Sequence, residues 1–175
     1  MKIKYFLILV ISFLLTQVLF AQNENQDSSN CDCTECHQLD FWIGEWNVEW
    51  ENQDSTISEG TNLVNSILDG CVIEENFDGN PGMDFRGKSL SVYNHNKKIW
   101  QQTWVDDTGG YMIFTGSMED DKMILSRTVE TTKGALMQRM LFYNIQKDSF
   151  DWNWESSTDG GKNWKLNWKI KYTRK

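Results

Sequence analysis

The chain has 175 residues and a formal net charge of −8 at pH 7, with 25 acidic residues against 17 lysine and arginine residues. An acidic surface of this kind repels nucleic acid and anionic lipid, which excludes both as expected partners. Nine Trp, nine Phe and five Tyr, with a single Pro, favour strands over helices in a chain whose length fits one domain.

The first segment, residues 1–21, has the pattern of a secretory signal peptide. Lys2 and Lys4 precede a long apolar run, and the small residue Ala21 comes just before a polar stretch. A basic start, an apolar centre and a small residue at the cut are typical of a cleaved export signal. A membrane anchor is the alternative, because the run is marginally long for a span. We expect cleavage after Ala21, no membrane association afterwards, and a periplasmic or secreted protein.

The second segment, residues 22–36, is predicted to be a leader that contains three cysteines. Residues 22–30 have no apolar side chain, which is typical of disorder. The folded domain is therefore expected to cover residues 37–175.

Residues 37–175 have the pattern of many short strands. Trp46, Val48 and Trp50 alternate with polar residues, which is the period of a half-buried strand. Nine further runs, joined by Gly, Asp and Asn turns, cover residues 57–68, 71–77, 88–93, 99–105, 111–117, 122–129, 135–145, 150–155 and 163–172. About ten short strands at regular spacing predict an all-β fold, either a barrel or a sandwich. We favour a single antiparallel barrel, because closure removes exposed sheet edges.

The motif Phe41-Trp42-Ile43-Gly44-Glu45-Trp46 stands at the start of this domain. It resembles the Gly-x-Trp signature that opens lipocalin-type barrels. In such barrels the Gly permits a tight turn into the first strand, and the Trp plugs the closed end. The resemblance implies a basic residue late in the chain that stacks on Trp46. Arg174 is the first candidate and Lys171 the second, and the roles of Gly44, Trp46 and Arg174 are structural.

A longer resemblance covers nearly all of the chain after residue 30. Its pieces, in order, are Cys31…Glu35…Gln38-x-Asp40-Phe41-Trp42-x-Gly44-Glu45-Trp46, Ile67-Leu68-x-Gly70-Cys71, Gly87-Lys88-Ser89, Trp100-x-Gln102-Thr103-Trp104-Val105-Asp106 and Ser157-Thr158-Asp159-Gly160-Gly161-Lys162-x-Trp164. On these residues the chain is similar to a family of exported bacterial lipocalin-like proteins, with barrels of calycin or nitrobindin type and no assigned activity. The resemblance implies a fold and carries no reaction.

Four cysteines in an exported protein argue for disulfides, and the residues alone leave three pairings open. The resemblance implies that Cys31 pairs with Cys71. Cys33 and Cys36 depart from the family pattern, and a short-loop disulfide is their simplest interpretation. A redox C-x-x-C pair is one alternative. A zinc site formed by the three clustered cysteines and His37 is another, although we predict no metal.

The candidate ligand-binding residues are chosen because they share one face of a predicted strand or, in one case, because they carry an isolated charge. They are Trp100, Gln102, Trp104, Asp106, Arg139, Trp152 and Trp154. The first four share one face of a predicted strand, and the last two share a face of another. If these faces point inward, they line a mostly apolar cavity with a few polar groups. The alternative is that the rings fill the barrel and leave no cavity. Arg139 is either an inward anion anchor or an outward charge.

Catalytic signatures are absent from the sequence. It contains no H-E-x-x-H motif, phosphate-binding Gly loop or dinucleotide fingerprint. Neither His37 nor His95 has the nucleophile and carboxylate context of a catalytic triad. No histidine follows His95, which argues against haem held from a late strand, as in nitrobindin-type barrels. We predict no cofactor and no catalytic residue.

The neighbouring acidic pairs, Glu74 with Glu75 and Asp106 with Asp107, are typical of solvated strand ends. Acid–base catalysis would require a buried Asp106 or Glu74 with a raised pKa beside a cavity.

The sequence therefore favours a non-enzymatic binding protein that takes a small apolar or amphipathic molecule into a Trp-lined barrel. A structural or interaction domain with a filled core, and an uncharacterised barrel enzyme, are the alternatives.

Overall fold

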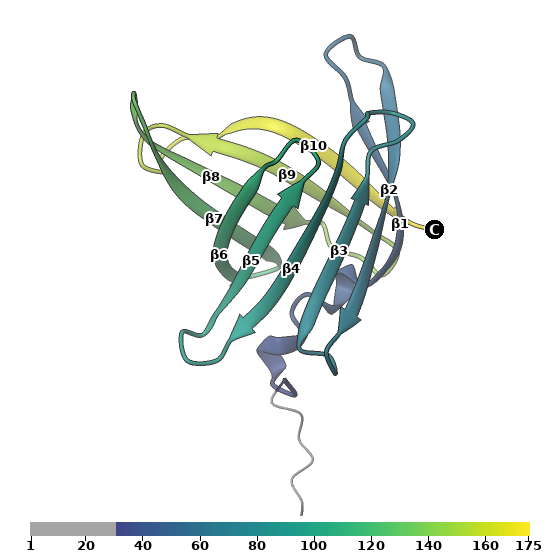
Figure 1. Cartoon of the computed structure of the whole chain (residues 1–175), viewed down its shortest axis with the longest axis vertical. Coiled ribbons are helices and arrows are strands. Elements are labelled where there is room, and N and C mark those ends of the chain that lie inside the picture. Colours follow the sequence, from purple (N-terminus) through teal and green to yellow (C-terminus); the bar gives the residue numbers. More distant parts are fainter. Residues whose placement is uncertain (1–30) are drawn as a thin grey trace, which may run out of the picture.

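The protein is a closed antiparallel β-barrel (Figure 1). A computed structural model describes residues 31–175, so the predicted export signal and residues 22–30 of the predicted leader lie outside the described residues. The strands are β1 (Gly44–Glu51), β2 (Ile57–Ile67), β3 (Val72–Asp78), β4 (Arg86–Asn94), β5 (Ile99–Asp106), β6 (Tyr111–Glu119), β7 (Lys122–Thr131), β8 (Gly134–Tyr143), β9 (Ser149–Ser157) and β10 (Lys165–Arg174). The predicted all-β class and ten-stranded barrel are confirmed.

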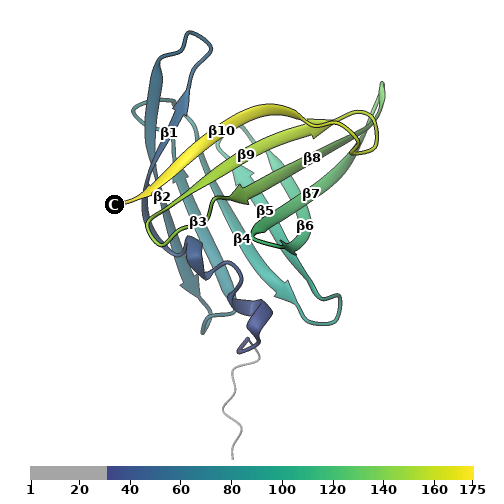
Figure 2. The ribbon, with the colours of Figure 1, turned by 180° about the vertical axis from the view of Figure 1, so that it is seen from behind.

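Each strand pairs with its neighbour in the sequence, and β10 returns to pair with β1 (Figure 2). In this last pair Trp46 lies opposite Arg174 and Glu49 opposite Lys171. Closure gives the backbone groups of both outer strands a partner, which an open sheet would leave exposed. Along β1 the side chains alternate between buried and exposed, as the period-two pattern predicts.

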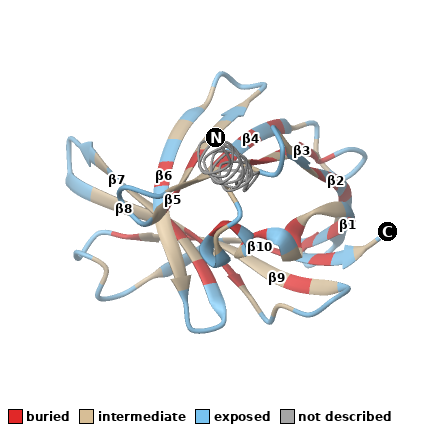
Figure 3. Cartoon of the chain, turned by 90° about the horizontal axis from the view of Figure 1, so that it is seen from below, coloured by how far each residue is buried: buried red, intermediate tan, exposed pale blue. Residues whose placement is uncertain are grey.

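A short segment before β1 crosses one end of the barrel (Figure 3). The segment contains two single-turn 3-10 helices, η1 (Thr34–His37) and η2 (Asp40–Trp42). Leu39 and Trp42 are both buried within it. The Trp42 ring meets the edge of Phe142 at a centroid distance of 5.2 Å. The helices therefore act as an apolar cap on this end.

Two disulfides hold this capping segment. Cys31 is bonded to Cys71, which is the pairing that the family resemblance implies, and Cys33 is bonded to Cys36. The first bond ties the start of the cap to the β2–β3 turn, so residues 31–36, which were expected in the leader, are part of the ordered cap. Such bonds form and persist in oxidising environments. None of the helices in residues 31–175 is long and apolar enough to cross a membrane.

The entry into β1 depends on Gly44, Trp46 and Arg174. Gly44 has φ of +138°, and a Cβ atom there would collide with the Arg174 guanidinium, so glycine is required on two counts. The guanidinium carbon of Arg174 lies 4.2 Å from the centre of the Trp46 ring. The same group donates hydrogen bonds to the backbone carbonyls of Ile43 at 3.0 Å and Lys147 at 3.1 Å. One side chain thus joins the cap, the first strand and the β8–β9 connection.

We expect Arg174→Ala to lower the free energy of unfolding by about 2–3 kcal/mol, because it removes a cation–π contact and charged donors to otherwise unpaired carbonyls. Arg174→Lys should recover little, since a lysine cannot reproduce the forked donors. Urea denaturation measures both effects. Lys175→Ala, which removes only an exposed ion pair with Glu45, is the matched control and should change stability by less than about 0.5 kcal/mol. Equal effects at the two positions would contradict the assigned role of Arg174.

Candidate ligand-binding site

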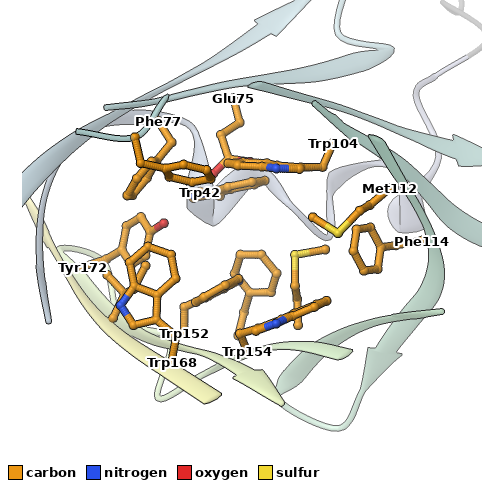
Figure 4. A pocket seen from close by; sticks show the side chains of 14 residues that line it. Trp42, Glu75, Phe77, Trp104, Met112, Phe114, Trp152, Trp154, Trp168 and Tyr172 are labelled. Carbon is orange, nitrogen blue, oxygen red and sulfur yellow. The ribbon is translucent and has the colours of Figure 1, made fainter. Parts of the chain in front are cut away.

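A cavity of about 190 Å³ lies inside the barrel, and Figure 4 shows its side chains arranged around a common space. Its lining consists of Trp42, Glu75, Phe77, Phe85, Trp104, Met112, Phe114, Met140, Phe142, Trp152, Trp154, Trp168, Ile170 and Tyr172. All but Glu75 are aromatic, Met or Ile side chains. An apolar cavity of about 150 Å³ is large enough to hold benzene. This one therefore has room for a molecule built on a single ring.

The cavity extends from the cap toward the opposite end of the barrel. Trp42 of η2 contributes at the capped end, and Phe85, from the loop between β3 and β4, contributes at the other. Trp104 stacks on Phe85 at a centroid distance of 6.2 Å. Its ring lies against Gly87, where a Cβ atom would occupy the same space. The glycine within β4 thus makes room for part of the cavity wall.

Edge-to-face contacts between rings hold the rest of the wall. Trp168 meets Trp152 at 5.9 Å between centroids and an interplanar angle of 88°, and meets Phe77 at 5.9 Å and 84°. Phe114 meets Trp154 at 5.7 Å and 82°. Each such pair is worth about 0.5–1.5 kcal/mol beyond the area it buries. These contacts resist collapse of the rings into the space between them.

A polar corner, made of Asn62, Glu75, Ser89 and Tyr172, interrupts the apolar wall. The Glu75 carboxylate accepts a hydrogen bond from Asn62 Nδ2 at 2.7 Å and another from Ser89 Oγ at 2.7 Å. The same Asn62 nitrogen lies 3.2 Å from the Tyr172 hydroxyl. Glu75 and Ser89 are direct partners across β3 and β4. All four are buried, with Glu75 only 6% exposed.

Burial dominates the electrostatics of this corner. Loss of solvent raises the pKa of Glu75 to about 7, although the hydrogen bonds from Ser89 and Asn62 act in the opposite direction. Burial, followed by the nearby charge of Glu75, raises the pKa of Tyr172 well above its usual value. Among the described residues that line the cavity, none is basic. The protonation of Glu75 therefore changes near neutral pH without a cation to compensate it.

Two buried polar atoms here have no hydrogen-bond partner within residues 31–175. They are Asn62 Oδ1, an acceptor in the polar corner, and Trp42 Nε1, a donor on a residue of the cavity wall. An unpaired buried polar group typically costs about 1–3 kcal/mol.

Three of the predicted ligand-binding residues line the cavity, namely Trp104, Trp152 and Trp154. Trp100 and Gln102 are also buried but serve other contacts. Trp100 Nε1 donates to Gln38 of the cap at 3.2 Å, and Gln102 Nε2 donates to Ser91 at 2.9 Å. These two side chains tie the cap and the sheet together and do not reach the lining.

Asp106 and Arg139 also lie away from the lining. Asp106 accepts hydrogen bonds from Thr108 and Gly110 in the β5–β6 turn, and the bond from the Thr108 hydroxyl is the main reason that its pKa is lowered. Arg139 pairs with Glu155 at 2.6 Å, and its guanidinium carbon lies 4.0 Å from the centre of the Trp164 ring. Its charge is therefore already compensated by the protein.

Glu75 and Tyr172 are not among the ligand-binding residues that the sequence predicts. Glu75 was treated as one of a solvated acidic pair, yet it shares the period-two face of Ile73 and Phe77, both of which are buried. That alternation was the available signal. Tyr172 is the last residue of the predicted run 163–172 and carries no further sequence signal. The acid–base alternative had named Glu74 or Asp106, whereas the buried carboxyl beside the cavity belongs to Glu75.

The cysteine cluster does not assemble the ligand set of the zinc alternative. His37 contacts Asp40 at 2.8 Å, and the histidine nearest the cysteines is His95, whose Nε2 lies 3.7 Å from Cys36 Sγ. All four cysteines are disulfide-bonded. In the described part of the chain, these disulfides hold the cap in place.

Comparison with known proteins places the chain in a family. The model of a family described as "Protein of unknown function (DUF1579)" matches residues 33–174, which include both helices of the cap and all ten strands. The chain belongs to this family. A comparison with the curated proteins finds no match. The family carries no reaction or ligand, so a function must be argued from the cavity.

The raised pKa of Glu75 predicts a pH-dependent loss of stability. Between pH 4.5 and about 7 the unfolded chain releases this proton while the folded protein keeps it, so stability falls as the pH rises and the loss is complete above about 7. The expected loss is about 3 kcal/mol. Glu75→Gln should abolish it, whereas the neighbouring change Glu74→Gln should not. Urea denaturation across this range measures both, and parallel profiles for wild type and Glu75→Gln would contradict the burial argument.

Proposed function

We propose that the protein binds a small apolar or amphipathic molecule of about one ring inside the barrel, without chemically changing it. The observation that carries this proposal is the cavity of about 190 Å³ whose wall combines Trp, Phe and Met side chains with one polar corner. Ligand sites of small molecules have this composition, in which apolar surface supplies affinity and a few polar groups set orientation.

The cavity also bears on the alternative of a structural domain with a filled core. Such a domain gains most from close packing, because each void costs dispersion and transfer energy. Here the aromatic rings contact one another around an open space. Met112 and Met140, two flexible side chains, line this space and do not fill it. Flexible Met side chains suit a wall that adjusts to a guest.

The proposed location is outside the cytoplasm, either periplasmic or secreted. Two disulfides in the described part of the chain fit an oxidising compartment. The basic, apolar and small-residue pattern of residues 1–21 fits export. A barrel of this kind in such a compartment would capture its ligand from the surrounding fluid.

A cavity-filling variant tests the binding proposal. We expect 2-phenylethanol, a one-ring amphipathic probe, to bind the purified protein in calorimetric titration. Met112→Trp, on the cavity wall, should weaken that binding by at least about tenfold, because the larger side chain occupies the space. Ile113→Trp is the matched control: it lies one residue away on the same strand, is 52% exposed, and should leave affinity unchanged. Equal affinity in both variants, or failure of wild type to bind one-ring probes of any charge, would reject the proposal.

Acid–base catalysis is a second candidate function, and the specific observation in its favour is Glu75. A carboxyl with a pKa of about 7 is suited to moving a proton at neutral pH. The Tyr172 hydroxyl beside it is suited to donating a hydrogen bond to a substrate oxygen. On this proposal the protein speeds deuterium exchange next to the carbonyl of phenylacetone, as measured by NMR, and Glu75→Gln removes the effect. Exchange at the buffer rate would reject it.

A further inference from the structure

The polar corner contains more hydrogen-bond acceptors than donors. Its acceptors include both oxygens of Glu75 and Oδ1 of Asn62, the latter without a partner in the described chain. Its donors are already engaged, since Asn62 Nδ2 donates to Glu75 and Tyr172 and the Ser89 hydroxyl donates to Glu75. Only the Tyr172 O–H remains. Of the corner residues, Glu75 and Tyr172 line the cavity, so a guest that contacts the Glu75 carboxylate must bring a donor.

The corner also lacks a positive charge. The elements packed around Glu75 contribute Asn62 from β2, Ser89 from β4 and Tyr172 from β10, and none of these is cationic. Glu75 and Tyr172 are the titratable groups among the described lining residues. An ionised carboxylate removed from water is costly unless it is paired. A cation in the cavity would supply that pair.

The aromatic wall favours the same kind of guest. Four Trp side chains besides Trp42 line the cavity, and the face of an indole attracts a cation. A ring-sized apolar body would fill the space between them, while an ammonium group at its end would donate to Glu75. An anionic guest of the same shape would face the carboxylate instead.

We propose that the cavity selects a small organic ammonium ion, with an apolar body of about one ring and an N–H-bearing cationic end that contacts Glu75. The proposal rests on the binding function above and specifies its ligand class. Because the ammonium ion and the proton compete for the same carboxylate, binding below neutral pH displaces a proton from Glu75. Affinity for the cation therefore rises as the pH increases to about 7, where the carboxyl is half ionised, and levels off above it.

Three probes of nearly equal size test this selectivity: phenethylamine, 2-phenylethanol and phenylacetate, which are cationic, neutral and anionic at about pH 8. Calorimetry should show phenethylamine binding at least about tenfold more tightly than 2-phenylethanol, the effect expected of one charge-assisted hydrogen bond. Phenylacetate should bind most weakly. At about pH 6, titrations of phenethylamine in two buffers of different ionisation enthalpy should reveal the release of a proton.

Glu75→Gln is the decisive variant, and Glu74→Gln, on the outer face of the same strand, is its control. The amine preference should disappear in the first and persist in the second, while both still bind 2-phenylethanol, which verifies that the cavity is intact. Equal binding of the amine and the alcohol to wild type, or no proton release, would overturn this inference and leave the binding function standing. Failure of all three probes to bind wild type would overturn both. The wild-type measurements decide the matter even if Glu75→Gln does not fold.

Discussion

The barrel depends on the junction between its first and last strands, where Arg174 lies over Trp46. Arg174 sits where the backbones of β1 and β10 pair and close the barrel. Its guanidinium donates to a carbonyl where the cap enters β1 and covers the Trp46 ring. Glycine is required at position 44 for the same reason, because any side chain there would displace the Arg174 guanidinium. With this junction closed, the barrel surrounds an apolar interior in which Trp42 and Phe142, at the capped end, are buried.

An enclosed apolar interior changes the chemistry of whatever polar group is placed inside it. Glu75 is an ordinary strand residue by position, paired with Ser89 on β4. Burial alone moves its pKa to about 7, since two hydrogen bonds replace water only in part. The fold thus converts a carboxyl that would be fully ionised at neutral pH into one that is only partly ionised there. The cap and the aromatic contacts matter to function because they maintain this low-dielectric environment.

The sequence predicted the strands well because period-two alternation and turn residues are local signals. The ten runs agree with the observed strands within a few residues. In the hairpin from Ser157 to Trp164, the serine and aspartate side chains accept hydrogen bonds from turn amides. The cavity was harder to predict. The run from residue 99 to 106 alternates evenly, but only Trp104 reaches the lining. Trp100 contacts the cap, and Asp106, the last residue of β5, bonds to the turn that follows. The alternation of side chains indicates which of them face the interior, but it does not indicate how far along the barrel axis each one lies.

The carboxyl at position 75 is the residue least explained by stability. A glutamine of nearly the same shape could accept from Asn62 and donate to Ser89, and would avoid the cost of about 3 kcal/mol that the ionised carboxylate imposes above neutral pH. For stability alone, an ionised carboxylate surrounded by aromatic side chains is unfavourable. Local violations of this kind in natural proteins tend to mark functional sites. Because Glu75 lies at the polar corner of the cavity, it is the residue on which the proposed ligand class depends.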